Sequence, residues 1–246
     1  MEGIAFGENG EITGLYPSFL TNLRTMLEIA KEENVLLDLV VQPSIGKTLS
    51  TALYKADKSE YDFKTQMFVN SAVRNQYIKK VVEPLCEAVR SYPDVVMAME
   101  PVCQPENDVY EQNGSPYGTS FDNMAAFAGE VTASIRSRLP NIMISMESAR
   151  EQVYCYNDLD LDIVGVSKYN NTGEVLPAGS FKSVKPMWLS SFGASSQYNS
   201  SNDFQMQYVL SFYNNAMKNG YQGAFYWSYG YMAANADSLS LIDRGT

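Results

Sequence analysis

The sequence predicts an α/β fold with a parallel sheet, of the size of a (β/α)8 barrel. Apolar runs of strand length alternate with amphipathic segments of helix length. The strand-like runs are continuously apolar, as expected of strands that are buried on both faces. The chain has 246 residues, and one such barrel takes roughly 250 residues. No internal repeat or linker interrupts the pattern, so we expect a single domain over residues 1–246.

The first helix is expected over residues 18–33, where apolar side chains recur at helical spacing and Ser18 is available as an N-cap. Residues 35–41 form an apolar run interrupted only by Asp38, which is typical of a buried parallel strand. The same two patterns alternate to the end of the chain. They predict helices over about 70–91, 119–138 and 202–218, and strands over about 95–100, 141–146, 160–166, 186–191 and 221–227.

These patterns give six strands, so we predict an incomplete (β/α)8 barrel of the TIM type with about six recognisable βα strands. An eight-stranded barrel that lacks two strands leaves two sheet edges open. Three accounts of the gap stay open: the N-terminal part is truncated, the first 16 residues fill part of the gap, or a partner subunit covers it. We favour a homo-oligomer that covers the open edges.

Composition narrows the range of partners. A net charge of −10 disfavours nucleic acids and anionic membranes, which require basic patches, and it suits neutral partners such as polysaccharides. No apolar run approaches the roughly 20 residues of a membrane helix. The first residues (MEGIAFG) lack the basic and apolar regions of a signal peptide. Either the protein is not exported or a signal has been removed.

The chain contains no histidine. This excludes Ser-His-Asp and Cys-His nucleophile systems and most catalytic zinc sites. The cysteines Cys86, Cys103 and Cys155 are too few and too irregular for a disulfide framework or a zinc site. We therefore expect no metal and no cofactor, and proton transfer by carboxylate, tyrosine, lysine or cysteine side chains.

Two strand-like segments carry the functional signal. Residues 95–101 (VVMAMEP) end a strand at Glu100, and residues 185–193 (KPMWLSSFG) run into a tight Phe-Gly turn. Barrel active sites lie at the carboxyl ends of the strands. A carboxylate held in that position can have a raised pKa and act as a general acid. Glu100 is therefore the strongest candidate for a catalytic residue.

Both segments resemble strands of the cellulase-like glycoside hydrolases (family five type, clan A), and the resemblance covers nearly the whole chain from about residue 10. It implies a (β/α)8 barrel in which 95–101 is the fourth strand and 185–193 the seventh. It also implies that Glu100 is the acid/base residue, that the ligand is a β-linked oligosaccharide or polysaccharide, and that the protein is extracellular. The first strand, the first helix and the second strand of the family have no counterpart here.

Three positions depart from the family's pattern. Ser191 stands where the resemblance implies a nucleophilic glutamate, Met99 replaces an asparagine, and Ser167 replaces a histidine in the motif 167–169 (SKY), whose Tyr169 is retained. A serine hydroxyl without a histidine or an obvious base is not an activated nucleophile. We therefore predict a protein of hydrolase descent that binds β-linked glycans and whose catalysis is degenerate.

Two alternatives stay open. Glu147 follows the expected fifth strand, next to the strand that bears Glu100, and neighbouring strands are about 4.8 Å apart. These carboxylates therefore suit an active glycosidase, with Glu100 as general acid/base and Glu147 as a relocated partner, unless Glu147 pairs with Arg150. The other alternative is a non-catalytic oligomeric scaffold.

Aromatic residues complete the expected substrate-binding set. The resemblance implies that Trp227, at the end of the last strand, is the platform under the sugar. Tyr169 and Tyr229 also follow strands, and Ser191 would lie beside them. Flat aromatic faces suit the C–H-rich faces of sugars, so carbohydrate is the expected partner. Trp188 lies within a strand and is expected in the core or facing a helix.

Overall fold

The computed structural model describes residues 3–43, 63, 66–109, 119–149, 156–169, 172–193 and 202–227. The chain divides into two compact units. The first comprises Met1–Met146 and Asp158–Asp162, and the second comprises Glu147–Asn157 and Ile163–Thr246. A single domain over 1–246 stays a prediction. No helix in the described part of the chain is long and apolar enough to cross a membrane.

The first unit begins with an antiparallel hairpin that the sequence patterns did not predict. Its strands are β1 (Ile4–Phe6) and β2 (Ile12–Leu15). The backbone N–H of Gly7 donates to the carbonyl of Glu11 at 2.8 Å and closes the turn. The strands bury only Ile4 and Ile12. Such short strands, with one inward residue each, leave too little alternation to be recognised in a sequence.

Helix α1 (Pro17–Glu32) follows the hairpin, and the prediction that Ser18 caps it is wrong. The N-cap is Tyr16, in an extended conformation, and Pro17 occupies the first helical position. Proline suits that position because its fixed φ is already helical and its missing N–H would have had no partner. Ser18 therefore lies inside the first turn.

Three parallel strands form the sheet of the first unit, in the order β3 (Leu37–Val40), β4 (Val96–Glu100) and β5 (Met143–Ser148). The last two residues of β5, Glu147 and Ser148, belong to the second unit. Val40 pairs with Glu100, and the N–H of Val41 donates to the carbonyl of Glu100 at 2.8 Å. The expected strand 35–41 is thus shorter than its apolar run. Val35 and Leu36 lie outside it, with 48 % and 59 % of their surface exposed.

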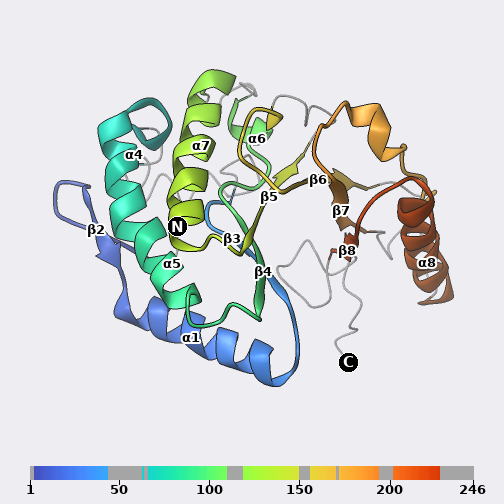
Figure 1. Cartoon of the computed structure of the whole chain (residues 1–246), viewed down its shortest axis with the longest axis horizontal. Coiled ribbons are helices and arrows are strands. Elements are labelled where there is room, and N and C mark those ends of the chain that lie inside the picture. Colours follow the sequence, from blue (N-terminus) through green and yellow to red (C-terminus); the bar gives the residue numbers. More distant parts are fainter. Residues whose placement is uncertain are drawn as a thin grey trace. The chain divides into compact units, whose positions relative to one another are not determined.

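Helices cover this sheet. A continuous helical segment consists of α4 (Ser71–Tyr77), the π-helical turn η1 (Ile78–Val82) and α5 (Glu83–Val89), and it is the helix that the sequence predicts over 70–91. The side chain of Asn70 caps its first turn. Helix α7 (Phe121–Arg138), capped by Ser120, lies beside it (Figure 1). The short helix α6 (Glu106–Val109) was not predicted.

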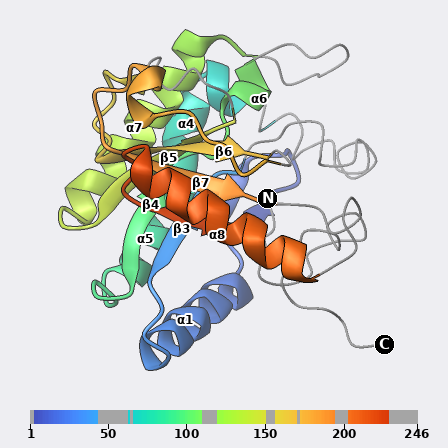
Figure 2. The same ribbon diagram turned by 90° about the vertical axis from the view of Figure 1, so that its right-hand side faces the viewer.

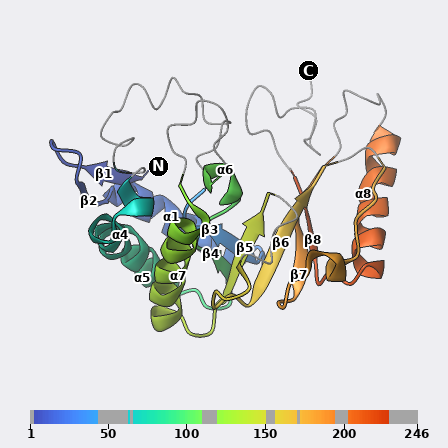
Figure 3. The same cartoon turned by 90° about the horizontal axis from the view of Figure 1, so that it is seen from above.

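The second unit contains the strands β6 (Ile163–Lys168), β7 (Met187–Phe192) and β8 (Ala224–Tyr226), parallel and adjacent in that order (Figure 3). Helix α8 (Asn202–Lys218) packs against β7 and β8 (Figure 2). The described part of the β6–β7 connection holds only the single 3₁₀ turn η3 (Ala178–Phe181). Together the two units contain the six parallel strands that the sequence predicts.

Close packing between β6 and β7 explains why position 165 is a glycine. A Cβ on Gly165 would lie 2.5 Å from the Cβ of Ser190 and 2.6 Å from Nε1 of Trp188. No side chain larger than hydrogen fits there without displacing one of these residues. Trp188 is buried and makes an edge-to-face contact with Phe225, so its expected place in the core is confirmed.

Candidate functional site

A bulge in β7 sets the geometry of the second unit's site. Val166 of β6 pairs with Leu189, and Ser167 pairs with Ser191, so Ser190 is one residue in excess of its partner strand. The pairing with β8 shifts over the same residues. Bulges re-aim the side chains that follow them and are frequent beside active sites. Here the bulge brings Ser191 opposite Ser167.

Glu147 joins these two serines in a hydrogen-bonded cluster. Oε1 of Glu147 accepts from the hydroxyls of Ser167 and Ser191, and the Ser191 Oγ–Glu147 Oε1 distance is 2.9 Å. The two serine oxygens lie 3.0 Å apart. Glu147 is 8 % exposed and Ser191 is 6 % exposed. Two hydroxyl donors at one carboxylate oxygen satisfy the charged form and fix the orientation of the carboxyl group.

This cluster revises two expectations from the sequence. Glu147 lies inside β5 rather than after it, because the strand continues two residues beyond Met146. Ser191 also has a carboxylate at hydrogen-bond distance, whereas the sequence suggested no base near it. Ser167 was noted in the sequence only because it replaces the family's histidine in the SKY motif, and no contact with Glu147 was predicted for it. Arg150, the alternative partner of Glu147, lies outside the described residues.

A cavity of 290 Å³ opens beside Ser167. Its lining includes Ala149, Lys168 and Tyr169 at strand ends, with Phe181 and Tyr221 from the covering layer. This volume is near the lower end of the roughly 300–1,000 Å³ of small-molecule sites. Tyr169 is 47 % exposed. The cavity therefore combines aromatic surface with hydroxyl and ammonium groups next to the Glu147 cluster.

Trp227 lies directly after β8, and its backbone N–H donates to the carbonyl of Phe192 at 2.7 Å. That bond continues the β7–β8 ladder past the end of the strand. Its side chain is 41 % exposed, so an aromatic face is accessible at this end of the second unit. Tyr229, the other aromatic residue expected after this strand, lies outside the described residues.

In the first unit, Glu100 ends β4 as expected and is 3 % exposed. The segment after Glu100 is hydrogen-bonded to the segment after β3, since the N–H of Cys103 donates to the carbonyl of Gln42 at 2.9 Å. Met99 is buried, and it lines an apolar cavity together with Leu85 and Val89 of α5. A polar side chain at position 99 would therefore face the helix layer.

Asp38 makes a hydrogen bond inside the sheet. The hydroxyl of Ser145 on β5 lies 3.1 and 3.2 Å from the two carboxylate oxygens of Asp38 on β3. This contact spans the three-stranded sheet of the first unit. The structure thus brings together Glu147 and Ser191 in the second unit and places Glu100 in the first. The Glu100–Glu147 pair stays a prediction.

No protein-family model matches the sequence, and no curated protein is significantly similar to it. Solved structures are similar. The endo-1,4-β-mannanase from Eisenia fetida has a TM-score of 0.68 at 17 % identity, over 96 % of this chain and 72 % of that one. The β-mannanase from the blue mussel Mytilus edulis has a TM-score of 0.69 at 17 % identity, over 94 % and 73 %.

A GH5_18 protein from Streptomyces cattleya, solved in complex with Manβ1-4GlcNAc, has a TM-score of 0.75 at 10 % identity, over 94 % of this chain and 63 % of that one. Nearly all of this chain thus matches part of each larger protein. The resemblance to cellulase-like hydrolases is confirmed at the level of fold: the chain folds as a partial (β/α)8 barrel, similar to the GH5-type mannanases.

Proposed function

We propose that the protein binds a β-linked oligosaccharide of the mannan or glucan type in the second unit, and that it hydrolyses this ligand very slowly or not at all. The observation that carries the proposal is the Glu147–Ser167–Ser191 cluster beside a cavity with an aromatic edge. The similar solved structures include β-mannanases and a protein in complex with Manβ1-4GlcNAc. Both observations favour a β-linked sugar as ligand.

The chemistry of the cluster favours binding over cleavage. Ser191 offers a hydroxyl where a retaining hydrolase needs a carboxylate, and a hydroxyl cannot stabilise an oxocarbenium ion by charge. The carboxylate beside it is a weak base toward a serine hydroxyl, whose pKa is far higher. Glu147 with its two serine donors is suited to hold a sugar hydroxyl as an acceptor.

The test measures binding and turnover on the same samples. Mannooligosaccharides, cellooligosaccharides and xylooligosaccharides are titrated into the full chain, and reducing ends are assayed over days. Trp227→Ala should weaken binding by about tenfold, since an aromatic platform contributes roughly 1–2 kcal/mol beyond other contacts. Tyr16→Ala is the matched control, because Tyr16 is an exposed aromatic residue of the other unit.

Hydrolysis is the alternative outcome. Glu100 and Glu147 are both carboxylates at the carboxyl ends of parallel strands. Turnover that disappears in both Glu100→Gln and Glu147→Gln would identify a working acid and a relocated partner, and the binding-only proposal would be wrong. Equal background rates in the unmodified chain and in both variants support the proposal.

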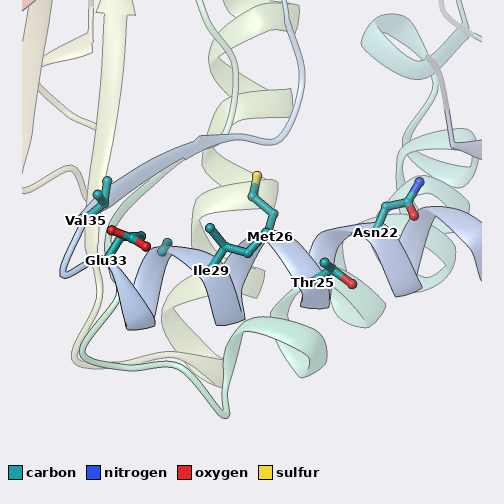
Figure 4. Close-up of a pocket in the computed structure, with 7 residues that line it drawn as sticks. Asn22, Thr25, Met26, Ile29, Glu33 and Val35 are labelled. Atoms are coloured by element: carbon teal, nitrogen blue, oxygen red, sulfur yellow. The ribbon is translucent and has the colours of Figure 1, made fainter.

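A second candidate function is self-association through the free edge of the first unit. In the described part of the chain β3 pairs with β4 and has no strand on its other side. A groove along α1 ends at Val35, two residues before β3. It is lined by Met26, Ile29 and Val35, with Asn22 and Glu33 toward its ends (Figure 4). If two copies align their grooves antiparallel, Glu33 of each copy faces Asn22 of the other, and the two carboxylates lie apart.

Sedimentation equilibrium of the full chain tests this proposal. A dimer that dissociates in Ile29→Glu supports assembly through the groove, because the carboxylate would be buried at the contact. Glu28→Gln is the control on the same helix. A chain that is monomeric at all concentrations excludes the scaffold function.

A further inference from the structure

The second unit carries another concave surface, along the β6–β7 connection. This groove has a volume of 560 Å³ and lies between residues 172–176 and helix α8. It is lined by Lys168, Thr172, Glu174 and Val175, by Asn215 of α8, and by Asn219, which directly follows α8. None of these residues belongs to the Glu147 cluster. The groove adjoins the cavity of the candidate site, because Lys168, Val175 and Leu176 line both. Its other lining residues, among them Thr172 and Glu174, do not line that cavity.

Hydrogen bonds from α8 and the residue that follows it hold one wall of the groove in place. Nδ2 of Asn215 donates to the carbonyl of Gly173 at 2.8 Å, and Nδ2 of Asn219 donates to that of Val175 at 2.9 Å. The hydroxyl of Tyr221 donates to the carbonyl of Leu176 at 3.0 Å. Three successive anchors on one extended segment give a preformed surface, which lowers the entropy lost when a ligand binds.

Gly173 shows how closely the segment lies on the helix. Its φ is +72°, and a Cβ there would lie 2.7 Å from the hydroxyl oxygen of Ser211. Both the backbone conformation and the space therefore require glycine. A wall that is fixed this closely to α8 keeps its shape whether or not a ligand is present.

The chemistry of the lining selects a neutral, hydroxyl-rich ligand. One ammonium group (Lys168) and one carboxylate (Glu174) balance in charge, so the groove favours neither an anion nor a cation. The amide oxygens of Asn215 and Asn219 are still able to accept, because their hydrogen bonds to the backbone use the NH₂ groups. Val175 and the 44 % exposed Leu176 add apolar surface for C–H groups. Alternating acceptors, donors and apolar patches match a pyranose ring.

We propose that this groove is a second oligosaccharide-binding surface, which adjoins the cavity of the Glu147 site and binds sugar through its own residues Thr172 and Glu174. This proposal rests on the proposed function, because it assumes that both sites bind a neutral saccharide. Its role would be to hold a glycan chain on the outer side of the second unit. No reaction takes place there, because the groove has a single carboxylate.

The experiment uses the full chain in four forms: unmodified, Thr172→Val/Glu174→Gln, Trp227→Ala, and all three changes combined. Mannotriose is titrated into each form and followed by backbone amide shifts, with inorganic phosphate as the competing probe. The unmodified chain should show two saccharide sites. The Thr172/Glu174 variant should lose affinity about tenfold at the groove only, since it removes two polar contacts.

The outcomes separate the two proposals. Binding in the groove that persists in Trp227→Ala, with no binding at the Glu147 site in any form, overturns the proposed function and leaves the groove site standing. A single site that is insensitive to the Thr172/Glu174 variant overturns the groove site alone. Shifts at the groove with phosphate and none with mannotriose overturn the ligand class. No saccharide binding in any form overturns both proposals.

Discussion

At the scale of single residues, the hydroxyl at position 191 decides what its neighbours can do. Ser191 donates to Glu147 and lies 3.0 Å from Ser167, so the three side chains satisfy one another. A second carboxylate at this position would meet Glu147 at hydrogen-bond distance. Two ionised carboxylates cannot share such a site without a pKa shift.

This reasoning predicts the result of Ser191→Glu. The like charge of Glu147 should raise the pKa of one carboxyl in the folded state above its unfolded value of about 4.3. The variant should therefore be closest in stability to the unmodified chain near pH 4. It should lose roughly 1–4 kcal/mol of unfolding free energy as the pH rises through the folded pKa. Urea denaturation at several pH values measures this.

Ser191→Gln controls for size, because it adds similar volume without charge. Its loss of stability should be the same at pH 4 and pH 7. If Ser191→Glu shows the same flat profile as Ser191→Gln, the two carboxylates do not interact, and the cluster geometry given above is wrong.

A second residue-scale prediction concerns glycine packing. Gly165→Ala should destabilise the protein by roughly 1–3 kcal/mol, since its Cβ would lie 2.5 Å from Ser190 and overpack the strand pair. Gly179→Ala is the control, because a Cβ there meets nothing within 4 Å. Thermal and urea unfolding of the two variants measure the difference. Equal unfolding free energies would contradict the packing seen between β6 and β7.

At the scale of elements, helix α5 carries a thiol, that of Cys86, whose pKa is markedly raised. Cys86 is fully buried, and burial raises the pKa of its thiol from 9.0 to about 11, although Arg138 and Arg90 act in the opposite direction. The folded state thus keeps the proton over a range in which the unfolded state loses it. Stability should fall as the pH rises from about 9 to about 11.

Cys86→Ala should remove this part of the alkaline loss, which two pKa units put at roughly 3 kcal/mol. The measurement is the unfolding free energy from urea at pH 8 and at pH 10.5, compared between the variant and the unmodified chain. Cys103→Ala is the control because Cys103 is only half-buried. An alkaline loss of equal size in all three proteins would show that other groups cause it.

The elements also show what the sequence could and could not predict. Helix α8 begins and ends where its pattern does, at Asn202 and Lys218, because Gly220 marks its end. Strand ends were less certain: β5 runs on to Ser148 and β3 stops at Val40, since apolar composition does not decide where pairing begins.

The candidate site was likewise predicted in part from the sequence. Glu100 and Glu147 were proposed from their positions at strand ends, whereas Ser191 and Trp227 were proposed from the resemblance to the hydrolase strands. The bulge decides that Ser191, and not Ser190, stands opposite Ser167, and a bulge has no signature in a single sequence. Motifs therefore indicate which residues matter, while the register decides which of them meet.

At the scale of the whole molecule, the net charge of −10 sets the behaviour toward salt. A neutral oligosaccharide interacts only weakly with the electrostatic field of this net charge. Its affinity should therefore change by less than about twofold between about 50 and 500 mM NaCl, over which charge interactions are strongly screened. Titrations at the two salt concentrations measure this. A tenfold change would mean that the bound ligand is charged and that the proposed ligand class is wrong.

Ser190 also has a consequence for how this strand tolerates change. Its removal would leave Leu189 opposite Val166 and Ser191 opposite Ser167, which is the pairing of an unbroken ladder. A methyl group added to Gly165, in contrast, would press on Ser190 and Trp188. In this strand, one residue fewer should therefore disturb the packing less than one methyl group more.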